Sequence, residues 1–227
     1  EDWELSSDEA DIYAVALANG RIRRVTDFPG AERNPVMAPN GKTLAFSYEE
    51  RRPLAFTPNR IALLDLQTQG MTILTDKLDG DANNILWAED SKSLYFSFDE
   101  RGMRHIRKIT RSKVVTTVAE DVGGTTIGRP YLSGGFHRAN GVTAFTQGRQ
   151  HRPSDVAIVK NKRLEVVTAL NDDLLDYRAL GKVTEVTYQS SFDGQEIQGW
   201  YVTPPDFDPT KKYPLILEIH GGPHPAY

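Results

Sequence analysis

The chain has 227 residues, 39% of them hydrophobic, and carries 27 lysines and arginines against 31 aspartates and glutamates. This composition is ordinary for a globular protein, and the net charge of −4, spread along the chain, lacks the basic stripe that nucleic-acid binding requires. No apolar run approaches the roughly 18 residues of a membrane-spanning helix, and the absence of cysteine excludes disulfides, thiolate zinc sites and cysteine nucleophiles. We therefore expect neither nucleic acid nor a membrane as a partner, whereas periplasmic and cytoplasmic locations both fit.

A repeat with an offset of 50 residues organises the first part of the chain. Residues 36–46 align with residues 86–96, and each copy reads as a strand end, a tight turn and a returning strand. Asn40-Gly41 and Asp90-Ser91 supply the two turns, because Asn, Asp and Gly tolerate the positive φ that a tight hairpin needs. A weaker third copy covers residues 140–145. The sequence thus predicts three similar hairpins.

A second kind of hairpin precedes and follows these copies. In each, two strands rich in β-branched residues meet at a short polar turn. These hairpins are predicted at residues 11–26, 60–75, 105–117 and 155–168. They recur at intervals of about 45 to 50 residues, so one unit holds four strands, which is typical of β-propeller blades. A plain antiparallel sandwich also has turns every 8–12 residues or so, but the fixed offset favours the propeller.

Residues 1–170 are therefore expected to form about three blades and part of a fourth. A closed propeller needs at least about four blades and commonly has six to eight. The chain also lacks an initiator Met and stops a few residues after a strongly apolar segment. We expect that both ends have been cut and that more protein follows Tyr227.

The pattern changes near residue 170. Residues 171–182 predict a short connecting helix, with Asn171 as its cap, acids in the first turn and a glycine stop. A hairpin is predicted over 183–203, and the apolar run at 215–219 predicts a strand buried on both faces of a mixed sheet. The expected fold class is mainly β, with incomplete β-propeller blades followed by residues 183–227 as the first strands of a truncated α/β domain.

His220-Gly221-Gly222-Pro223-His224 follows that predicted strand. A glycine turn at the carboxyl end of a buried strand can aim a backbone N–H at an oxyanion, because a Cβ would block the approach of a substrate. On these five residues alone, a plain strand–loop turn with glycines for steric reasons is an equal alternative.

The surrounding residues carry a family resemblance. Residues 188–205, together with 211–224, closely resemble the start of the catalytic α/β-hydrolase domain of the prolyl oligopeptidase family of serine peptidases, and Ile-His-Gly-Gly-Pro-His is similar to the acylaminoacyl-peptidase branch. The resemblance implies a propeller that gates access for short peptides. It implies that the Gly222 N–H lies in the oxyanion hole, on a loop shaped by Gly221 and His220.

The same resemblance implies what this chain does not contain. The family's nucleophilic serine, acid and base follow later in its catalytic domain, and no Gly-x-Ser-x-Gly motif occurs in these 227 residues. We therefore expect this fragment to be inactive by itself. Its expected partners are a short peptide and the rest of the catalytic domain, downstream or on a companion chain, and a homo-oligomer fits too. Acylaminoacyl-peptidase and dipeptidyl-peptidase-like activity are both open, and the alternative is a non-catalytic β-propeller binding module.

Several charged residues are further candidates for binding the ends of a peptide. Glu49-Glu50 is similar to the paired glutamates with which dipeptidyl peptidases hold a substrate N-terminus, but the adjacent Arg51-Arg52 favours a solvated charge cluster. Three arginines near the expected tunnel are candidates to meet a peptide carboxylate, although surface arginines are common. They are Arg101, Arg104 and Arg107.

No cofactor or metal is expected. His220 and His224 lie on a glycine-proline loop, which is a poor setting for paired metal ligands. The glycine pairs at 123–124 and 134–135 lack the strand-to-helix context of a phosphate-binding loop. Three further histidines lie among arginines and are expected to be solvated. They are His105, His137 and His151.

Overall fold

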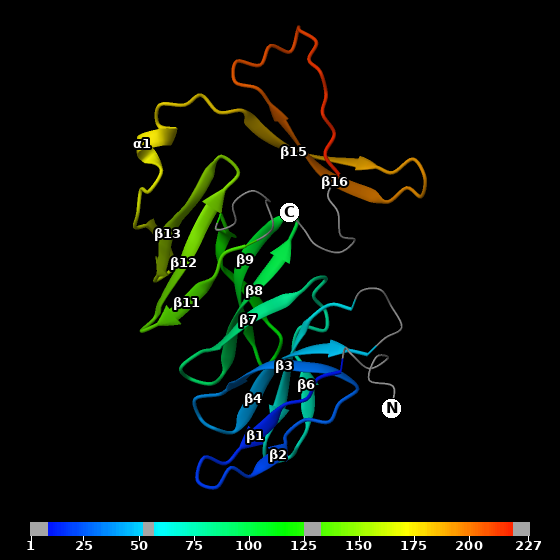
Figure 1. The fold of residues 1–227 in the computed structure, drawn as a ribbon, viewed down its shortest axis with the longest axis vertical. Coiled ribbons are helices and arrows are strands. Elements are labelled where there is room, and N and C mark those ends of the chain that lie inside the picture. The colour runs from blue at the N-terminus through cyan, green and yellow to red at the C-terminus, as the bar shows by residue number, and fades with distance from the viewer. Residues whose placement is uncertain (1–8, 52–56, 125–132, 220–227) are drawn as a thin grey trace.

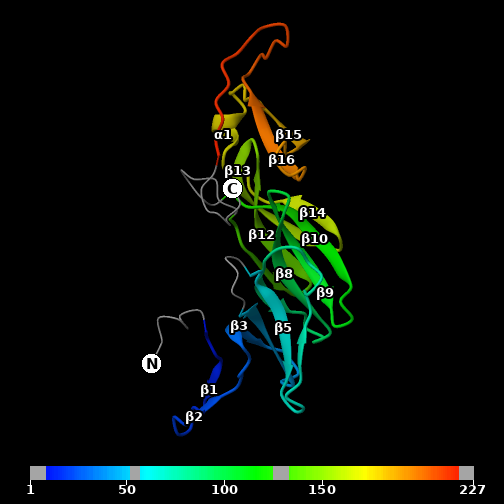
Figure 2. The same ribbon diagram turned by 90° about the vertical axis from the view of Figure 1, so that its right-hand side faces the viewer.

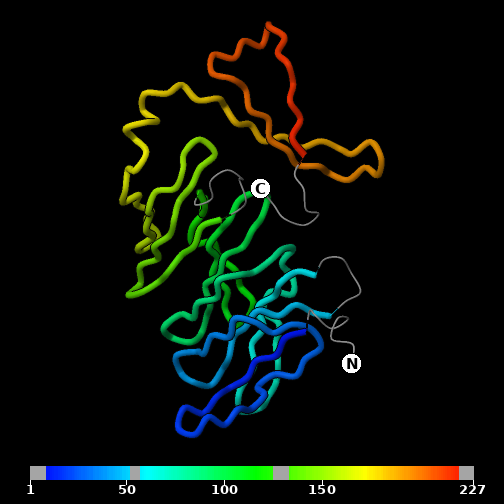
Figure 3. The backbone as a smooth tube through the Cα atoms, in the orientation of Figure 1, coloured from blue at the N-terminus to red at the C-terminus, as the bar shows by residue number. Residues whose placement is uncertain are grey.

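The computed structural model describes residues 9–51, 57–124 and 133–219, and antiparallel strands dominate this part of the chain (Figure 1). Three successive four-stranded units, which we call blades 1, 2 and 3, follow one another along the long axis of the molecule (Figure 3). A two-stranded hairpin precedes them, and a one-turn helix and a second hairpin come after them. The two hairpins lie at opposite ends of the molecule in both side views (Figures 1 and 2).

Each blade is a meander of antiparallel neighbours. The first hairpin consists of β1 (Tyr13–Val15) and β2 (Ile22–Arg24), and blade 1 consists of β3 (Gly30–Met37), β4 (Thr43–Glu50), β5 (Arg60–Asp65) and β6 (Met71–Ile73). Blade 2 consists of β7 (Ala82–Trp87), β8 (Ser93–Glu100), β9 (Met103–Thr110) and β10 (Val115–Val122). Blade 3 consists of β11 (Phe136–Ala139), β12 (Val142–Arg149), β13 (Arg152–Lys160) and β14 (Arg163–Val166). The last elements are α1 (Asp172–Leu175), β15 (Lys182–Gln189) and β16 (Glu196–Thr203). One residue pair, Val122 with Gln147, joins the sheets of blades 2 and 3.

The 50-residue repeat has a local structural basis. Asn34 and Asn84 both adopt a φ of 52° at a bulge in the first strand of their blade. Each donates its side-chain amide to a serine hydroxyl on the next strand, at 3.4 Å for Ser47 and 3.1 Å for Ser97. Asparagine tolerates this left-handed backbone, so equal residues at an offset of 50 produce equal bulges. The strands predicted at 36–46, 86–96 and 140–145 are confirmed.

A threonine recurs at the close of the outer hairpins. Its hydroxyl accepts the backbone N–H of a residue on or beside the first strand of the same hairpin: Thr26 from Ile12, Thr75 from Ile61 and Thr168 from Val156, at 2.8 to 2.9 Å. These bonds satisfy backbone donors where the strand ladder ends, which would otherwise be costly to bury. Each of these bonds therefore closes its own hairpin.

Apolar packing between blades holds the row together. One cluster joins Ile61 and Leu63 of blade 1 to Phe96 and Phe98 of blade 2, with all four side chains buried. Across the same junction, Trp87 donates its indole N–H to the Val36 carbonyl at 2.9 Å. A further cluster packs blade 2 against blade 3. Stability therefore comes from nearest-neighbour contacts between repeated units, as in other repeat architectures.

The connection after blade 3 differs from the prediction. Helix α1 has a single turn, and Asn171 makes no side-chain cap hydrogen bond. The predicted helix over 171–182 does not extend because Leu174, Tyr177 and Leu180 are exposed, by 54%, 84% and 46%. Without an apolar face to bury, a short helix has little tertiary support.

Among the described residues, no helix has the length and apolar character needed to span a membrane.

The part of the chain after α1 is described up to residue 219. The predicted hairpin over 183–203 is confirmed as β15 and β16, paired along their whole length. The strand predicted at 215–219 is not formed: Leu215, Ile216 and Leu217 are 88%, 90% and 76% exposed and belong to no sheet. A strand requires a hydrogen-bonded neighbour, and no described strand lies alongside this segment.

Candidate functional site

The predicted oxyanion loop lies outside the described residues. This holds for His220, Gly221 and Gly222 alike. The described structure shows instead the end of the blades that meets α1 and the β15–β16 hairpin. We call the segment 167–181 between β14 and β15 the linker, and this surface the linker-facing end. It is defined by the turn 100–103 between β8 and β9 and the turn 149–152 between β12 and β13 (Figure 1).

The β15–β16 hairpin is fixed to the turn 100–103. Arg101 donates to the Glu185 carboxylate at 2.7 Å, and the Gln198 amide donates to the same oxygen at 2.7 Å. These two donors, Arg101 first, lower the pKa of Glu185 below its usual value. Trp200 covers Gly102 so closely that a Cβ there would lie 2.5 Å from the indole ring. The hairpin therefore has one defined seat on blade 2.

The other two candidate arginines are paired within their own blade. Arg104 forms a two-pronged contact with Asp99, at 2.7 and 2.8 Å, and this contact raises the pKa of Arg104. Arg107 pairs with Glu100 and lies 4.6 Å from the centre of the Phe98 ring. A peptide carboxylate would have to displace these acids. The structure thus assigns both arginines to holding the β8–β9 turn.

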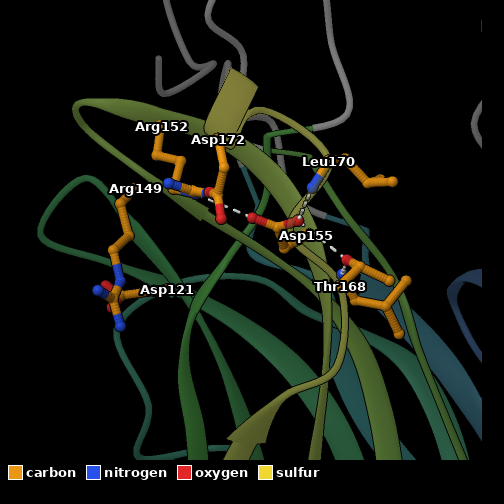
Figure 4. A network of polar contacts seen from close by, with 8 residues as sticks. Asp121, Arg149, Arg152, Asp155, Thr168, Leu170 and Asp172 are labelled. Atoms are coloured by element: carbon orange, nitrogen blue, oxygen red, sulfur yellow. Dashed lines mark hydrogen bonds and ion pairs between the residues drawn. The ribbon is translucent and has the colours of Figure 1, made fainter. Parts of the chain in front are cut away.

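A second polar network joins blade 3 to the linker (Figure 4). Its centre is Asp155, whose side chain is 4% exposed. The carboxylate accepts the Leu170 N–H at 2.8 Å, the Arg152 guanidinium at 2.9 Å and the Thr168 hydroxyl at 2.9 Å. These bonds, that of Leu170 first, lower the pKa of Asp155. Arg152 also contacts Asp172 of α1, so one arginine ties the linker to the blade.

The network lines a cleft of about 340 Å³ at the linker-facing end. Its wall also includes Gln147, which is buried, and Arg149, which reaches Asp121 at 3.7 Å. The acids of the cleft already face arginines or backbone donors. Nowhere in the described ranges do three or more His, Asp or Glu side chains gather in a way that could hold a metal ion. The residues that line the cleft thus hold the linker to blade 3.

Two other predicted groups have clear positions. Glu49 lies 3.7 Å from Arg33 and is 45% exposed, which agrees with a solvated charge cluster. The prediction of solvated histidines is wrong for His105, which is 6% exposed on β9 and whose Nδ1 has no described partner. The next residue along β9, Ile106, is buried as well, so both faces of the strand are covered at this point. His137 and His151 are exposed as predicted.

Sequence comparison connects the chain to peptidases. The chain is 30% identical over 224 residues to dipeptidyl-peptidase 5 of Porphyromonas gingivalis, covering 96% of this chain and 31% of the relative. It is 25% identical over 188 residues to the uncharacterized peptidase YuxL of Bacillus subtilis, covering 75% of this chain and 27% of the relative. The chain thus spans less than a third of these relatives. No protein-family model matches it.

Structural comparison supports the propeller architecture. The AtxE2 isopeptidase superposes with a TM-score of 0.62 at 16% identity, over 89% of this chain and 31% of the isopeptidase chain. At this level of identity the similarity concerns the fold. The blades are therefore propeller-like, and over most of its length the chain is homologous to proteins named as peptidases.

Proposed function

We propose that this chain, a homologue of named peptidases, is the propeller part and the opening of the catalytic domain of a serine peptidase that hydrolyses short peptides. The observation that carries the proposal is the seat of the β15–β16 hairpin on blade 2, through Glu185 and Trp200. It fixes the first element after the linker directly on the propeller. The residues that resemble the catalytic domain thus begin at the propeller surface, where a gate for substrates is required.

In the proposed reaction, a serine outside this chain attacks the peptide carbonyl while a histidine takes its proton. The N–H of Gly222 donates a hydrogen bond to the oxyanion that forms. One such donor typically contributes about 10²–10³ in rate. Gly221 and His220 shape the loop, and Gly222 leaves room for the substrate because it has no Cβ. The remaining catalytic domain is the required partner, and the blades restrict entry to short peptides.

The names of the relatives favour release of dipeptides from the N-terminus of a peptide. The sequence Ile-His-Gly-Gly-Pro-His favours a second candidate, release of an N-acylated amino acid. The two are separated by offering the intact protein one peptide with a free N-terminus and the same peptide N-acetylated, and by identifying the products by mass. Dipeptides from the free peptide alone support the first activity. Cleavage of the acetylated peptide alone supports the second, and cleavage of neither favours the binding module.

A further inference from the structure

Glu32 is a buried carboxyl group at the joint between the β1–β2 hairpin and blade 1. It lies on β3 and is 2% exposed. Its backbone N–H donates to the Ala10 carbonyl at 2.6 Å, and its Oε2 accepts the Thr26 hydroxyl at 3.0 Å. Its Oε1 is buried and has no hydrogen-bond partner among the described residues. An ionised carboxylate in this position keeps a charge away from water with a single side-chain donor, which is costly.

The charged neighbours of Glu32 do not compensate it. The Asp11 carboxylate lies within hydrogen-bonding reach, but two ionised carboxylates have no proton to share. Arg24 of β2 binds Asp11 at 2.7 Å and Asp27 at 2.7 Å, so its contacts neutralise those two acids.

The facing strand adds no charge beside Glu32. The residue opposite it on β4 is Tyr48, whose hydroxyl donates to the Pro29 carbonyl. The neighbouring pair Arg33 and Glu49 lies one position along each strand and therefore on the opposite face. In the described ranges, no basic side chain forms an ion pair with Glu32.

Asp155 shows what the same threonine contact looks like around an ionised acid. It too accepts a threonine hydroxyl, from Thr168, but it also receives the Arg152 guanidinium and the Leu170 N–H. Glu32 has the threonine without the arginine or the N–H. Both acids therefore accept a threonine hydroxyl, but only Asp155 has the further donors that stabilise a negative charge.

We propose that Glu32 keeps its proton at a pH where exposed carboxyl groups are ionised, that it donates a hydrogen bond to the Asp11 carboxylate, and that this proton makes the joint between the β1–β2 hairpin and blade 1 sensitive to pH. A proton on Glu32 supplies the donor that two neighbouring carboxylates lack. Asp11 is also bound by Arg24. The neutral acid then ties the segment before β1 to β3.

The direction of the pH effect follows from linkage. Burial, and after it the charge of Asp11, raises the pKa of Glu32 above its ordinary value of 4.5. The stabilisation is complete below that ordinary value and is lost as the pH rises through the raised pKa of the folded state. Within this window the folding equilibrium of the joint falls up to about tenfold per pH unit. The joint is therefore tightest in acid and loosens as the pH rises.

The test is infrared spectroscopy of the intact protein at about pH 6, where ordinary carboxyl groups are ionised; it detects the C=O stretch of a protonated carboxyl group. We expect that band in the wild type, its loss in Glu32→Gln, and its retention in Glu49→Gln, a control on the adjacent strand. The amide of Glu32→Gln can donate to Asp11 as the acid does, so this variant should fold. Absence of the band in the wild type, or its persistence in Glu32→Gln, would overturn the proposal.

A second measurement follows the joint itself. Hydrogen exchange of residues 10–26, corrected for the intrinsic pH dependence, should accelerate in the wild type as the pH rises from about 5 through neutral. In Glu32→Gln it should stay constant over the same range, because the amide does not titrate. Equal pH dependence in both proteins would contradict the assignment of the proton to Glu32.

Discussion

Arg101 and Glu185 form an ion pair at 2.7 Å although 84 residues separate them in the chain. Arg101 lies at the tip of the β8–β9 turn, and Glu185 is on the first strand after the linker. The Gln198 amide donates to both the Glu185 carboxylate and the Arg101 carbonyl. Together these contacts make the turn of blade 2 the seat of the β15–β16 hairpin, and they connect the two parts of the proposed enzyme.

Arg101→Ala should loosen the hairpin without unfolding the blades. The two side chains are 61% and 39% exposed, so solvent screens their attraction and the melting temperature should change little. Hydrogen exchange of residues 182–203 should become faster, and Glu185→Gln should have the same effect. Arg23→Ala, on the exposed strand β2, is the matched control. Unchanged exchange in Arg101→Ala would show that the ion pair does not hold the hairpin.

Gly102→Ala should displace Trp200. The residue has a φ of 69°, and an added Cβ would lie 2.5 Å from the indole ring. Gly141→Ala is the control, because Gly141 has a φ of 76° and nothing lies within 4 Å of its added Cβ. Both variants carry a backbone cost of about 1 kcal/mol, and only Gly102→Ala adds the clash. We expect Gly102→Ala to have a lower melting temperature than Gly141→Ala and, unlike this control, a changed tryptophan fluorescence. Equal melting temperatures and equal fluorescence in the two variants would contradict the contact between Gly102 and Trp200.

Phe46→Ala and Phe96→Ala should be similarly destabilising. The two residues occupy equivalent repeat positions, both are 0% exposed, and removal of a buried phenyl ring typically costs about 3–5 kcal/mol. Phe192→Ala is the control, because Phe192 is 96% exposed in the β15–β16 turn. Denaturant unfolding measures all three. A large difference between the two core variants would argue that the blades are not equivalent.

Acid should release the linker from blade 3. The pKa of Asp155 is lowered by the Leu170 N–H, Arg152 and Thr168, so its contribution is present above its ordinary pKa of 3.8 and is lost as the pH falls through the lowered value. Asp155→Asn should therefore show fast exchange of residues 168–176 already at neutral pH. Asp173→Asn, exposed on α1, should leave that exchange slow. Slow exchange in Asp155→Asn would contradict the anchoring role.

Local sequence signals predicted the strands of the blades. Turns such as Asn40-Gly41 depend on the conformational preference of one or two residues, and the 50-residue offset repeats that preference. The bulge asparagines Asn34 and Asn84 follow the same rule, although the sequence pattern alone did not reveal them. The predicted hairpin over 183–203 also required only local information.

Contacts between residues far apart in the chain could not be predicted from local sequence patterns. Nothing near Arg101 in the sequence indicates Glu185 as its partner, and surface arginines without a partner look the same. The burial of His105 depends on what covers β9 in the fold and not on its arginine neighbours in the sequence. The apolar run at 215–219 predicted a strand from composition, whereas strand formation depends on a neighbouring strand. The proposed oxyanion residue Gly222 lies outside the described residues and stays a prediction.

The most direct test of the proposed function is covalent labelling of the intact protein with a fluorophosphonate probe, which reacts with activated serines. We predict one adduct, on a serine outside residues 1–227, and no adduct on a protein consisting of these residues alone. Labelling should be lost when that serine is replaced by alanine. An intact protein that takes no label, and has no labelled companion chain, would contradict the peptidase and favour the binding module.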